Sequence, residues 1–375
     1  MRIGFNLHFS DDFLSGVEYY SLSLIRALLD YVDGNQYVVF TNRPDLVMRY
    51  VGAADALTVI QAPYPRGRPF RIFWEHALLP SFARAESLDL LHCPCYICPL
   101  RTAGVPYAVT VHDTIAIDHP QWCKRSNAAY YNLVMRSALR RASVVVAVSR
   151  ASAEALRRNC LVDEARLRVI YSGVDPLFAG RASPSQMRAV RARYSLPEQY
   201  ILYVGNIEPK KNLVGLLGAY RLLARAGFPH GLVLVGHRHW KSGRVFREAR
   251  RRDLAHKVLF AGYVAREDLP AVYQMAALYV CTSLYEGFGF PPLEAMASGL
   301  PVVSSRRGAL GETLGDSAYG VEPTDPRAVA DAMALMLSDD GLRLEYRRRG
   351  VERSRNFTWS RTAVELGAVY RELAS

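Results

Sequence analysis

The sequence predicts an α/β protein of two doubly wound domains, each a parallel sheet wrapped by helices. The chain has 375 residues, which exceeds one ordinary hydrophobic core and favours two domains of ~150–190 residues. Short apolar runs rich in β-branched residues alternate with helical patterns almost throughout, as parallel strands with helical crossovers require. The alternation breaks once, between Ser172 and Pro197, and then restarts. These three observations give the fold class.

In the first half, short apolar runs predict the strands, and amphipathic patterns predict the helices. Leu22, Ile25 and Leu28 share one face of a helix expected over 16–31. Ser149 can cap a helix that follows a strand. The expected strands are 2–7, 36–41, 57–61, 89–92, 107–111, 143–148 and 167–170, and the remaining helices are 71–85, 126–141 and 150–158.

The second half repeats the same alternation after the turn at Ser172–Pro176 and a polar helix over 184–194. We place the domain boundary in this stretch because turn residues and a break in rhythm mark it. The expected strands are 200–204, 231–235, 257–260, 278–281, 301–303 and 318–321; the expected helices are 212–225, 243–254, 267–276, 291–298, 326–338, 340–354 and a last one ending near Leu373.

Composition narrows the class of protein. Half of the residues are hydrophobic, as in packed globular proteins, and no run approaches the ~18–20 apolar residues that cross a bilayer. The first residues already form a strand rather than a signal peptide, so we expect a cytoplasmic protein. The net charge of +12 predicts attraction to an anionic ligand or surface. No nucleic-acid-binding signature accompanies the charge, so we do not expect a nucleic-acid partner.

Six cysteines raise the question of a metal. Cys95 and Cys98 form a C-x-x-C pair, but a structural zinc site needs a second such pair and the sequence has none. We therefore expect buried thiols and no metal.

The strongest functional motif begins at Glu286, after the apolar strand that ends at Cys281. Gly287 and Gly289 let the backbone approach a ligand closely, and the free N–H groups of a helix N-terminus suit a diphosphate. Glu294 follows Glu286 by eight positions, and a carboxylate there can accept hydrogen bonds from vicinal sugar hydroxyls.

This stretch resembles the E-x7-E signature of the retaining family 4 glycosyltransferases, enzymes of GT-B fold. The resemblance implies two Rossmann-like domains facing a central cleft. It implies that Glu294 holds the donor ribose, that Glu286 with the backbone at Phe288–Phe290 holds the transferred sugar, and that Leu293 lies in the donor site. A glycine-rich loop with two surface glutamates is the alternative.

A second strand-to-helix turn contains Gly205, Asn206, Lys210 and Lys211. A lysine at a helix start beside a glycine can clamp a diphosphate and stabilise a leaving group without a metal. Members of the resembled family often carry an arginine where this chain has Asn206. Which lysine contacts the phosphates is left open, and a solvated lysine pair is the alternative.

Two features of the first domain fit the same reaction. Gly16 begins a helix whose N-terminus can approach phosphates. His112 ends a strand, where it can hydrogen-bond a sugar hydroxyl, and the resemblance makes it the active-site histidine. A structural histidine paired with Asp113 is the alternative. By resemblance, Tyr263 and Val264 lie in the base-binding loop; good matches cover most of 200–321 and only short islands of the first half.

The segment from Pro65 to Trp74 mixes arginines with aromatics. It can contact an anionic membrane surface or a lipid-linked acceptor, or it can be a loop whose aromatics are core. The acceptor or membrane candidates are Arg66, Arg68, Arg71 and Trp74.

Taken with the resemblance, the sequence predicts an acceptor domain over 1–180, a donor domain over 190–355 and a helix at 356–375 that returns to the first domain. The expected enzyme is a metal-independent, retaining hexosyltransferase without a cofactor, peripheral on the inner face of the membrane if the arginine-rich segment binds lipid. Its donor is a nucleotide-diphosphate sugar, with mannose a guess from the family, and its acceptor is a saccharide or a lipid-linked sugar. Kinase and dehydrogenase readings fail because no P-loop or G-x-G-x-x-G is present. A phosphorylase, an epimerase and a non-catalytic basic scaffold remain as alternatives.

Overall fold

The computed structural model describes residues 1–9, 14–31, 33–64, 67–101, 103–159 and 161–374. The chain divides into two compact units. Unit 1 comprises residues 1–173 with 358–375, and unit 2 comprises residues 174–357. The change of unit after Gly173 lies within the stretch from Ser172 to Pro197, where we placed the boundary.

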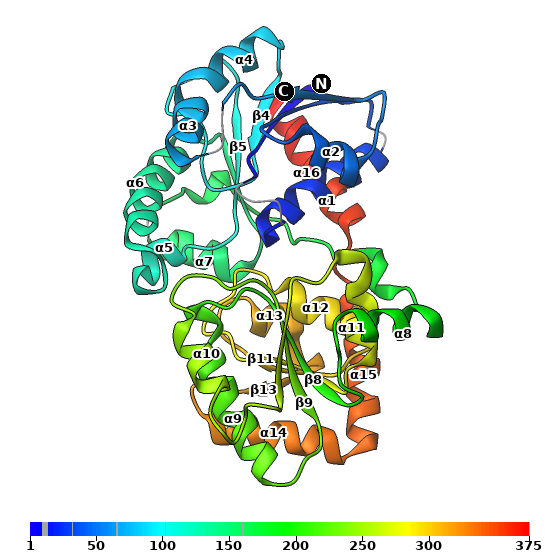
Figure 1. The fold of residues 1–375 in the computed structure, drawn as a ribbon. Helices are drawn as coiled ribbons and strands as arrows, with labels where there is room; N and C mark the ends of the chain where they lie inside the picture. Colours follow the sequence, from blue (N-terminus) through cyan, green and yellow to red (C-terminus); the bar gives the residue numbers. More distant parts are fainter. Residues whose placement is uncertain (10–13, 32, 65–66, 102, 160, 375) are drawn as a thin grey trace. The chain divides into compact units, whose positions relative to one another are not determined.

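Unit 1 is built on a parallel sheet whose order is β3-β2-β1-β4-β5-β6-β7 (Figure 1). The chain leaves β1 toward β3 in one direction and starts again at β4 in the other, which makes the sheet doubly wound. The described strands are β1 (Arg2–Leu7), β2 (Gln36–Thr41), β3 (Leu57–Gln61), β4 (Leu90–Cys93), β5 (Tyr107–Val111), β6 (Val144–Ala147) and β7 (Leu167–Val169).

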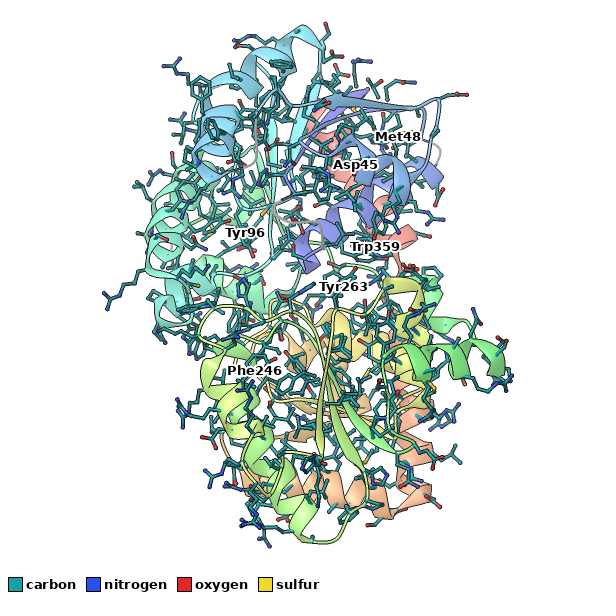
Figure 2. The ribbon with its side chains drawn as sticks, viewed as in Figure 1. Asp45, Met48, Tyr96, Phe246, Tyr263 and Trp359 are labelled. Atoms are coloured by element: carbon teal, nitrogen blue, oxygen red, sulfur yellow. The ribbon has the colours of Figure 1, made fainter. Side chains whose placement is uncertain are left out.

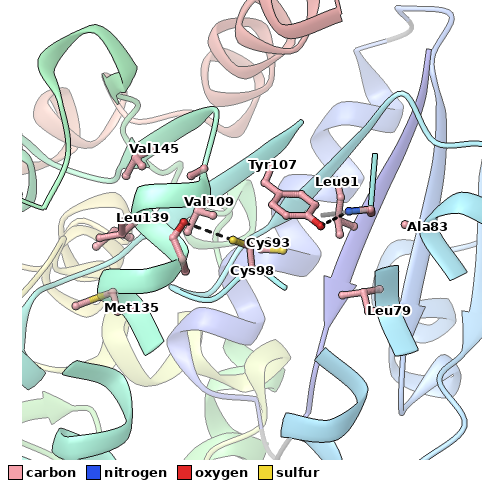
Figure 3. Packing of buried hydrophobic residues seen from close by; sticks show 14 of the residues in the cluster. Leu79, Ala83, Leu91, Cys93, Cys98, Tyr107, Val109, Met135, Leu139 and Val145 are labelled. Carbon is pink, nitrogen blue, oxygen red and sulfur yellow. Dashed lines mark hydrogen bonds between the residues drawn. The ribbon is translucent and has the colours of Figure 1, made fainter. Parts of the chain in front are cut away.

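Helices cover both faces of this sheet. One face packs against α4, α6 and α7 and forms a core that includes Leu79, Met135 and Leu156; Figure 3 shows part of this core around Val109 and Leu139. The described helices of unit 1 are α1 (Gly16–Asp30), α2 (Pro44–Val51), α3 (Arg68–Phe73), α4 (Leu79–Ala85), α5 (Ile115–Asp118), α6 (Arg125–Arg141), α7 (Arg150–Arg158) and α16 (Trp359–Ala374), with a π-helical turn at Trp74–Leu78.

The last helix, α16, belongs to unit 1 although it follows unit 2 in the chain. It packs beside α1 and buries Leu366 and Tyr370 completely. The Tyr370 hydroxyl lies 2.5 Å from Nδ1 of His92 on β4. A buried side-chain hydrogen bond thus fixes the helix on the sheet.

Unit 2 has a second parallel sheet, in the order β10-β9-β8-β11-β12-β13. Here the winding reverses between β8 and β11. The described strands are β8 (Tyr200–Val204), β9 (Gly231–Val235), β10 (Val258–Gly262), β11 (Leu278–Cys281), β12 (Val302–Ser305) and β13 (Tyr319–Val321).

Helices α9, α10 and α14 share one core with this sheet, in which Leu216, Val245 and Met333 are buried. Helix α12 packs on α15. The described helices of unit 2 are α8 (Pro184–Arg193), α9 (Leu213–Arg225), α10 (Gly243–Ala249), α11 (Leu269–Met275), α12 (Phe290–Ala297), α13 (Leu310–Leu314), α14 (Pro326–Ser338) and α15 (Asp340–Ser354).

The predicted fold class is confirmed, since both sheets are parallel and doubly wound. The helix expected over 71–85 is present and begins at Arg68, and its middle turn, Trp74–Leu78, is π-helical. Helix α2 was not predicted. In the part of the chain that the structure describes, no helix combines the length and apolar character needed to cross a membrane.

Candidate active site

The candidate donor site of unit 2 lies where the sheet reverses direction. Strands β8 and β11 are neighbours, and ligands of doubly wound sheets bind beyond the carboxyl ends of the strands at this point. The turn after β8 and the turn after β11 meet there: the N–H of Leu284 donates to the carbonyl of Lys210 at 2.7 Å. Both turns carry the motifs that the sequence singled out.

The two lysines of the first turn have different partners. Lys211 Nζ lies 2.5 Å from Glu286 Oε1, whereas Lys210 Nζ lies 3.8 Å from Glu208 Oε1. Both belong to a short 3₁₀ turn, Pro209–Lys211, which ends at Asn212 in the left-handed conformation. The lysine turn therefore brings Lys211 within hydrogen-bond distance of the glutamate of the second turn.

Glu286 is held as a carboxylate. Ser283 Oγ also donates to Glu286 Oε1, at 2.7 Å. Burial acts to raise the pKa of Glu286, but the positive charges of Lys211 and Lys210 and these hydrogen bonds outweigh it, and the pKa falls below its usual value. At neutral pH the group accepts hydrogen bonds and donates none.

Glycine turns at the carboxyl ends of three adjacent strands lie against one another. The N–H of Gly205 donates to Val235, and the N–H of Gly236 donates to Gly262, at 2.9 and 2.7 Å. Gly236 has φ +139°, and a Cβ on it would lie 2.1 Å from the carbonyl oxygen of Gly205. Only glycine lets the two backbones approach this closely.

Asn206 continues this turn, and its carbonyl accepts a hydrogen bond from the Tyr203 hydroxyl at 3.1 Å. Beyond β10, the ring of Tyr263 stacks on that of His237 with centroids 5.1 Å apart; Figure 2 labels Tyr263. Val264 beside it is buried. An aromatic platform thus lies next to the glycine turns.

Helix α12 begins in the second turn. Gly289 caps it in the left-handed conformation, φ +100°, and Pro291 and Pro292 occupy its first turn, where a missing N–H costs least. The carbonyl of Phe288 accepts a hydrogen bond from Thr313 at 3.0 Å, and the Phe288 and Phe290 rings contact each other. The hydrogen bond from Thr313 and the contact with the Phe290 ring therefore hold the loop at Phe288 in place.

Leu293 lies in the first turns of α12, and its contact with the donor stays a prediction. Its side chain is fully buried, and its N–H donates to the carbonyl of Gly289.

Glu294 is buried inside α12, with both carboxylate oxygens engaged. Arg266 Nη1 lies 3.2 Å from Oε1, and the Tyr273 hydroxyl lies 3.1 Å from Oε2. Burial raises the pKa of Glu294 in spite of the Arg266 charge. A carboxylate has about four acceptor positions, so each oxygen can still accept a further hydroxyl.

His112 lies just beyond the carboxyl end of β5 in unit 1 and is almost fully buried. Its Nε2 lies 2.8 Å from the carbonyl of Pro94, which requires the proton on Nε2 and leaves Nδ1 as an acceptor. Burial lowers the pKa of His112, so the ring is neutral at pH 7. Edge contacts from Tyr20 and Tyr96 fix its orientation.

Gly16 is the first residue of α1, and a Cβ added to it would meet no described residue within 4 Å. Ser15 caps the helix, and its N–H bonds the Glu18 carboxylate at 2.6 Å. The helix start is open beside Gly16.

Comparison with known proteins decides the family. Residues 14–177 match the family described as "Glycosyltransferase Family 4", and residues 189–357 match "Glycosyl transferases group 1". The chain is 31% identical to O-antigen chain mannosyltransferase B of Escherichia coli over 76% of this chain and 74% of the relative. This chain belongs to glycosyltransferase family 4.

A second relative is much longer than the part of it that matches this chain. The serotype-specific mannosyltransferase WbdA of Escherichia coli is 28% identical over 72% of this glycosyltransferase, which spans 34% of WbdA. Among solved structures, Anabaena HepE in complex with UDP-glucose has a TM-score of 0.78 at 20% identity, covering 98% of this chain and 100% of HepE. This likeness shows the GT-B fold of the glycosyltransferase.

In the arginine-rich segment, Trp74 fits the second of the two interpretations, in which the aromatics are core. Trp74 is 1% exposed, and its indole N–H donates to Asn6 at 3.0 Å, so it is a core residue and cannot touch a membrane. Arg68 is bound to Asn127 of α6, and Arg71 lies beside Glu75. Arg66 lies outside the described residues.

Two cysteines of the glycosyltransferase are packing residues of unit 1. Cys93 and Cys98 are buried in the core of unit 1, where the Cys98 thiol donates to the Ala138 carbonyl (Figure 3). Burial raises the pKa of Cys95 and of Cys98 to about 12, so both thiols stay protonated.

Sequence reasoning missed several residues that build the site. Ser283, Arg266 and Tyr273 hydrogen-bond the two glutamates, and Gly308 approaches Glu286 so closely that a Cβ would lie 2.5 Å from its carbonyl oxygen. The only available signal was the position of Ser283 in the same turn. Gly236 and Gly308 follow strands β9 and β12, whose neighbours the sequence does not reveal.

Proposed function

We propose that this family 4 enzyme transfers a hexosyl residue from a nucleoside diphosphate to a saccharide or lipid-linked acceptor. The assembly of a polysaccharide or glycolipid is the setting that we favour, with mannose as the sugar. The observation that carries the proposal is the pairing of Lys211 with Glu286 at the switch point of unit 2. Support for mannose comes from the relative named O-antigen chain mannosyltransferase B.

The donor would lie along the carboxyl edge of the unit 2 sheet. Lys211 and the N–H groups at the start of α12 would balance the diphosphate charge. Glu286 would accept hydroxyls of the transferred sugar and Glu294 those of the ribose. The remaining donor contacts that we propose are Gly205, Asn206, Lys210, Tyr263, Val264, Phe288, Gly289 and Phe290, with Gly16 of unit 1.

We propose transfer with retention at the anomeric carbon and without a metal. Departure of the nucleotide places negative charge on its terminal phosphate, and a fixed lysine with preorganised N–H donors can stabilise that charge. His112, neutral with Nδ1 as an acceptor, would orient a hydroxyl of the sugar. The acceptor oxygen gains the sugar, and its proton passes to the departing phosphate.

A panel of nucleotide sugars in a thermal-shift assay tests the donor assignment. We expect GDP-mannose to raise the melting temperature most, with UDP- and dTDP-sugars as the competing outcomes that would change the base. Proton NMR of the product should show an axial anomeric bond from an axial donor. Activity abolished by EDTA would overturn the metal-free scheme, and turnover that needs no acceptor or consumes free phosphate would favour an epimerase or a phosphorylase.

We also propose that unit 1 contacts an anionic membrane. The exposed side chains of Phe70, Phe73 and Leu133 are 50%, 59% and 75% accessible. They lie on α3 and α6, which Arg68 ties together, and α6 has four arginines and no acidic residue. Aromatic and basic residues together bind anionic lipid surfaces.

Flotation with phosphatidylglycerol-containing vesicles tests this contact. We expect Phe70→Ser with Phe73→Ser to reduce flotation at least fivefold and 0.5 M salt to weaken it. Leu344→Ser, which removes a residue 66% exposed in unit 2, is the matched control. Absence of binding by the unaltered protein at low salt would refute the proposal.

A further inference from the structure

Unit 1 has a hollow at the same topological place as the donor site of unit 2. It has a volume of about 200 Å³ and lies beyond the carboxyl ends of β1 and β4, the neighbouring strands between which the sheet reverses direction. Residues that follow β1, such as His8, and residues that follow β4, such as Tyr96, line it. Ligand sites of doubly wound sheets form at this position.

Two ionisable side chains in the hollow, the buried Glu75 and the partly buried Arg71, have hydrogen-bonding capacity that no described residue fills. Glu75, 6% exposed, sits in the π-helical turn, and its Oε2 lies 3.6 Å from Arg71 Nε. Neither of these two atoms has a hydrogen-bond partner in the part of the chain that the structure describes. Buried polar atoms are otherwise almost always satisfied, and π-helical turns recur at functional sites. A hydrogen-bond acceptor and a hydrogen-bond donor therefore lie side by side in the wall of the hollow.

The other walls suit a sugar ring. Tyr96 and Tyr131 line the hollow, and their rings meet at 5.8 Å. Tyr96 has φ +56°, a strained conformation that concentrates at binding sites. Its ring also contacts the ring of His112 at 5.6 Å. The ring of Tyr96 thus lies between the hollow and His112, the histidine that we assign to the reaction.

The charges of the hollow disfavour an anion. Arg71 is accompanied by two carboxyl groups, Glu75 and Glu18, both of which line the hollow. His8 is neutral because burial, followed by the Arg71 charge, lowers its pKa to about 4. Burial raises the pKa of Glu75 to about 7 in spite of the Arg71 charge, so this carboxyl group is partly ionised at neutral pH. A phosphate would meet Glu18 and the ionised fraction of Glu75 at close range, whereas neutral hydroxyls can donate to a carboxyl oxygen and accept from a guanidinium.

We propose that this hollow binds an uncharged sugar ring of the acceptor, with Glu75 and Arg71 as the pair that determines its specificity. The inference rests on the proposed glycosyl transfer and assigns the acceptor side of it. The volume, below the roughly 300–1,000 Å³ of pockets for drug-sized ligands, fits one ring and not a nucleotide sugar. The substrate class is a neutral saccharide, and the phosphate of a lipid-linked acceptor would have to lie elsewhere.

The test compares two conservative variants with matched controls in the full chain. Glu75→Gln and Arg71→Gln should each raise the KM for a methyl α-mannopyranoside acceptor about 10- to 100-fold, since unpaired buried polar groups then reject the hydroxyls. Hydrolysis of the donor by water, measured without acceptor, should change less than twofold. The controls Glu86→Gln and Arg2→Gln alter another Arg–Glu pair of unit 1 and should leave KM unchanged.

Ligand-observed NMR with the unaltered protein gives a second readout that does not depend on turnover. We expect saturation transfer to methyl α-mannopyranoside, lost in Glu75→Gln, and weaker transfer to mannose 6-phosphate. Stronger binding of the phosphate, or a lowered melting temperature with unchanged KM in both variants, would overturn the inference. Failure of the unaltered protein to bind or hydrolyse any nucleotide sugar would instead refute the proposed function, so the two failures are distinguishable.

Discussion

Lys211 and Glu286 come from turns that are 75 residues apart in the chain. Lys211 affects the ionisation of Glu286, and Glu286 affects the position of the Lys211 ammonium group. The lysine keeps a buried carboxylate charged, and the carboxylate holds the ammonium in one place, where it can meet a phosphate without reorganisation. Such preorganised charge is the largest single contribution in many enzymes. The neighbouring Lys210 is held by Glu208 instead.

We therefore predict that Lys211→Ala lowers kcat about 10²- to 10³-fold, the size of effect seen when one preorganised donor is removed. Without this lysine, the effect of burial on Glu286 should exceed that of the remaining charge and hydrogen bond, and the pKa of Glu286 should rise. Lys210→Ala should cause a smaller loss. Steady-state turnover of the nucleotide sugar measures both variants, and a larger loss for Lys210→Ala would contradict the assignment of Lys211 as the phosphate lysine.

His92 gives unit 1 a dependence on pH. It is completely buried between Tyr370 and Thr110, and burial, followed by the positive charge of His112, lowers its pKa from 6.5 to about 3. The unfolded chain therefore binds a proton more readily than the folded chain between these values, and stability falls as the pH falls through that window.

We predict that the free energy of unfolding decreases by about 2 kcal/mol from this residue alone between pH 7 and pH 5. Urea unfolding at both values measures it, with stability present above pH 6.5 and lost progressively toward pH 3. His92→Phe should flatten this slope. An unchanged slope in that variant would show that other groups, such as His8, cause the acid sensitivity.

At the scale of the element, the sequence predicts strands and helices well because their periodicity is local. Each parallel strand is a continuous apolar run, and turns with Gly, Pro or Ser separate it from an amphipathic helix. Helix α2 escaped prediction because Pro44–Val51 is short, and the π-helical turn escaped because no periodicity distinguishes it from α-helix. The two motif turns could be placed at strand ends, since parallel strands carry their carboxyl ends to one edge of the sheet.

The residues that pack against those turns could not be predicted, because the local sequence pattern does not determine the order of the strands in the sheet. Gly236 supports the lysine turn only because β9 lies beside β8. Gly308 packs on Glu286 only because β12 lies beside β11. Arg71 lay in a segment for which the sequence left two interpretations, and Glu75 was not singled out; the structure places both in the wall of the hollow.

We predict that Gly236→Ala destabilises unit 2 by roughly 2–4 kcal/mol, since the new Cβ would meet the Gly205 carbonyl in a conformation that L-residues avoid. Donor binding should weaken in parallel, because the Gly205 turn must move. Denaturant unfolding and nucleotide titration measure the two effects. Gly243→Ala, at the open start of α10, is the control and should change stability by less than about 1 kcal/mol.

At the scale of the whole molecule, the two units do not follow one another along the chain, because unit 1 contains both chain ends. Unit 2 is continuous from residue 174 to 357, and all the strands of its sheet lie within it. Unit 1 is completed only by residues 358–375. The side chains that α16 contributes to unit 1 include Leu366, Tyr370 and the mostly buried Trp359, which contacts Tyr20 (Figure 2). A parallel sheet must be covered on both faces, and α16 covers one face of β4.

Removal of residues 358–375 should therefore separate the two units in stability. Loss of three large buried side chains, each contributing about 1.5–3 kcal/mol, approaches the roughly 5–15 kcal/mol that stabilises a domain. We expect unit 1 to lose hydrogen-exchange protection throughout β1, β4 and β5, while the strands of unit 2 keep theirs. Nucleotide diphosphate binding should persist in the truncated chain, because Lys211 and Glu286 both belong to unit 2. Tyr370→Phe, which removes only the hydrogen bond to His92, should lower the protection of unit 1 slightly. Equal loss of protection in both units would show that their cores are coupled, and no loss in either would show that α16 is dispensable for the fold.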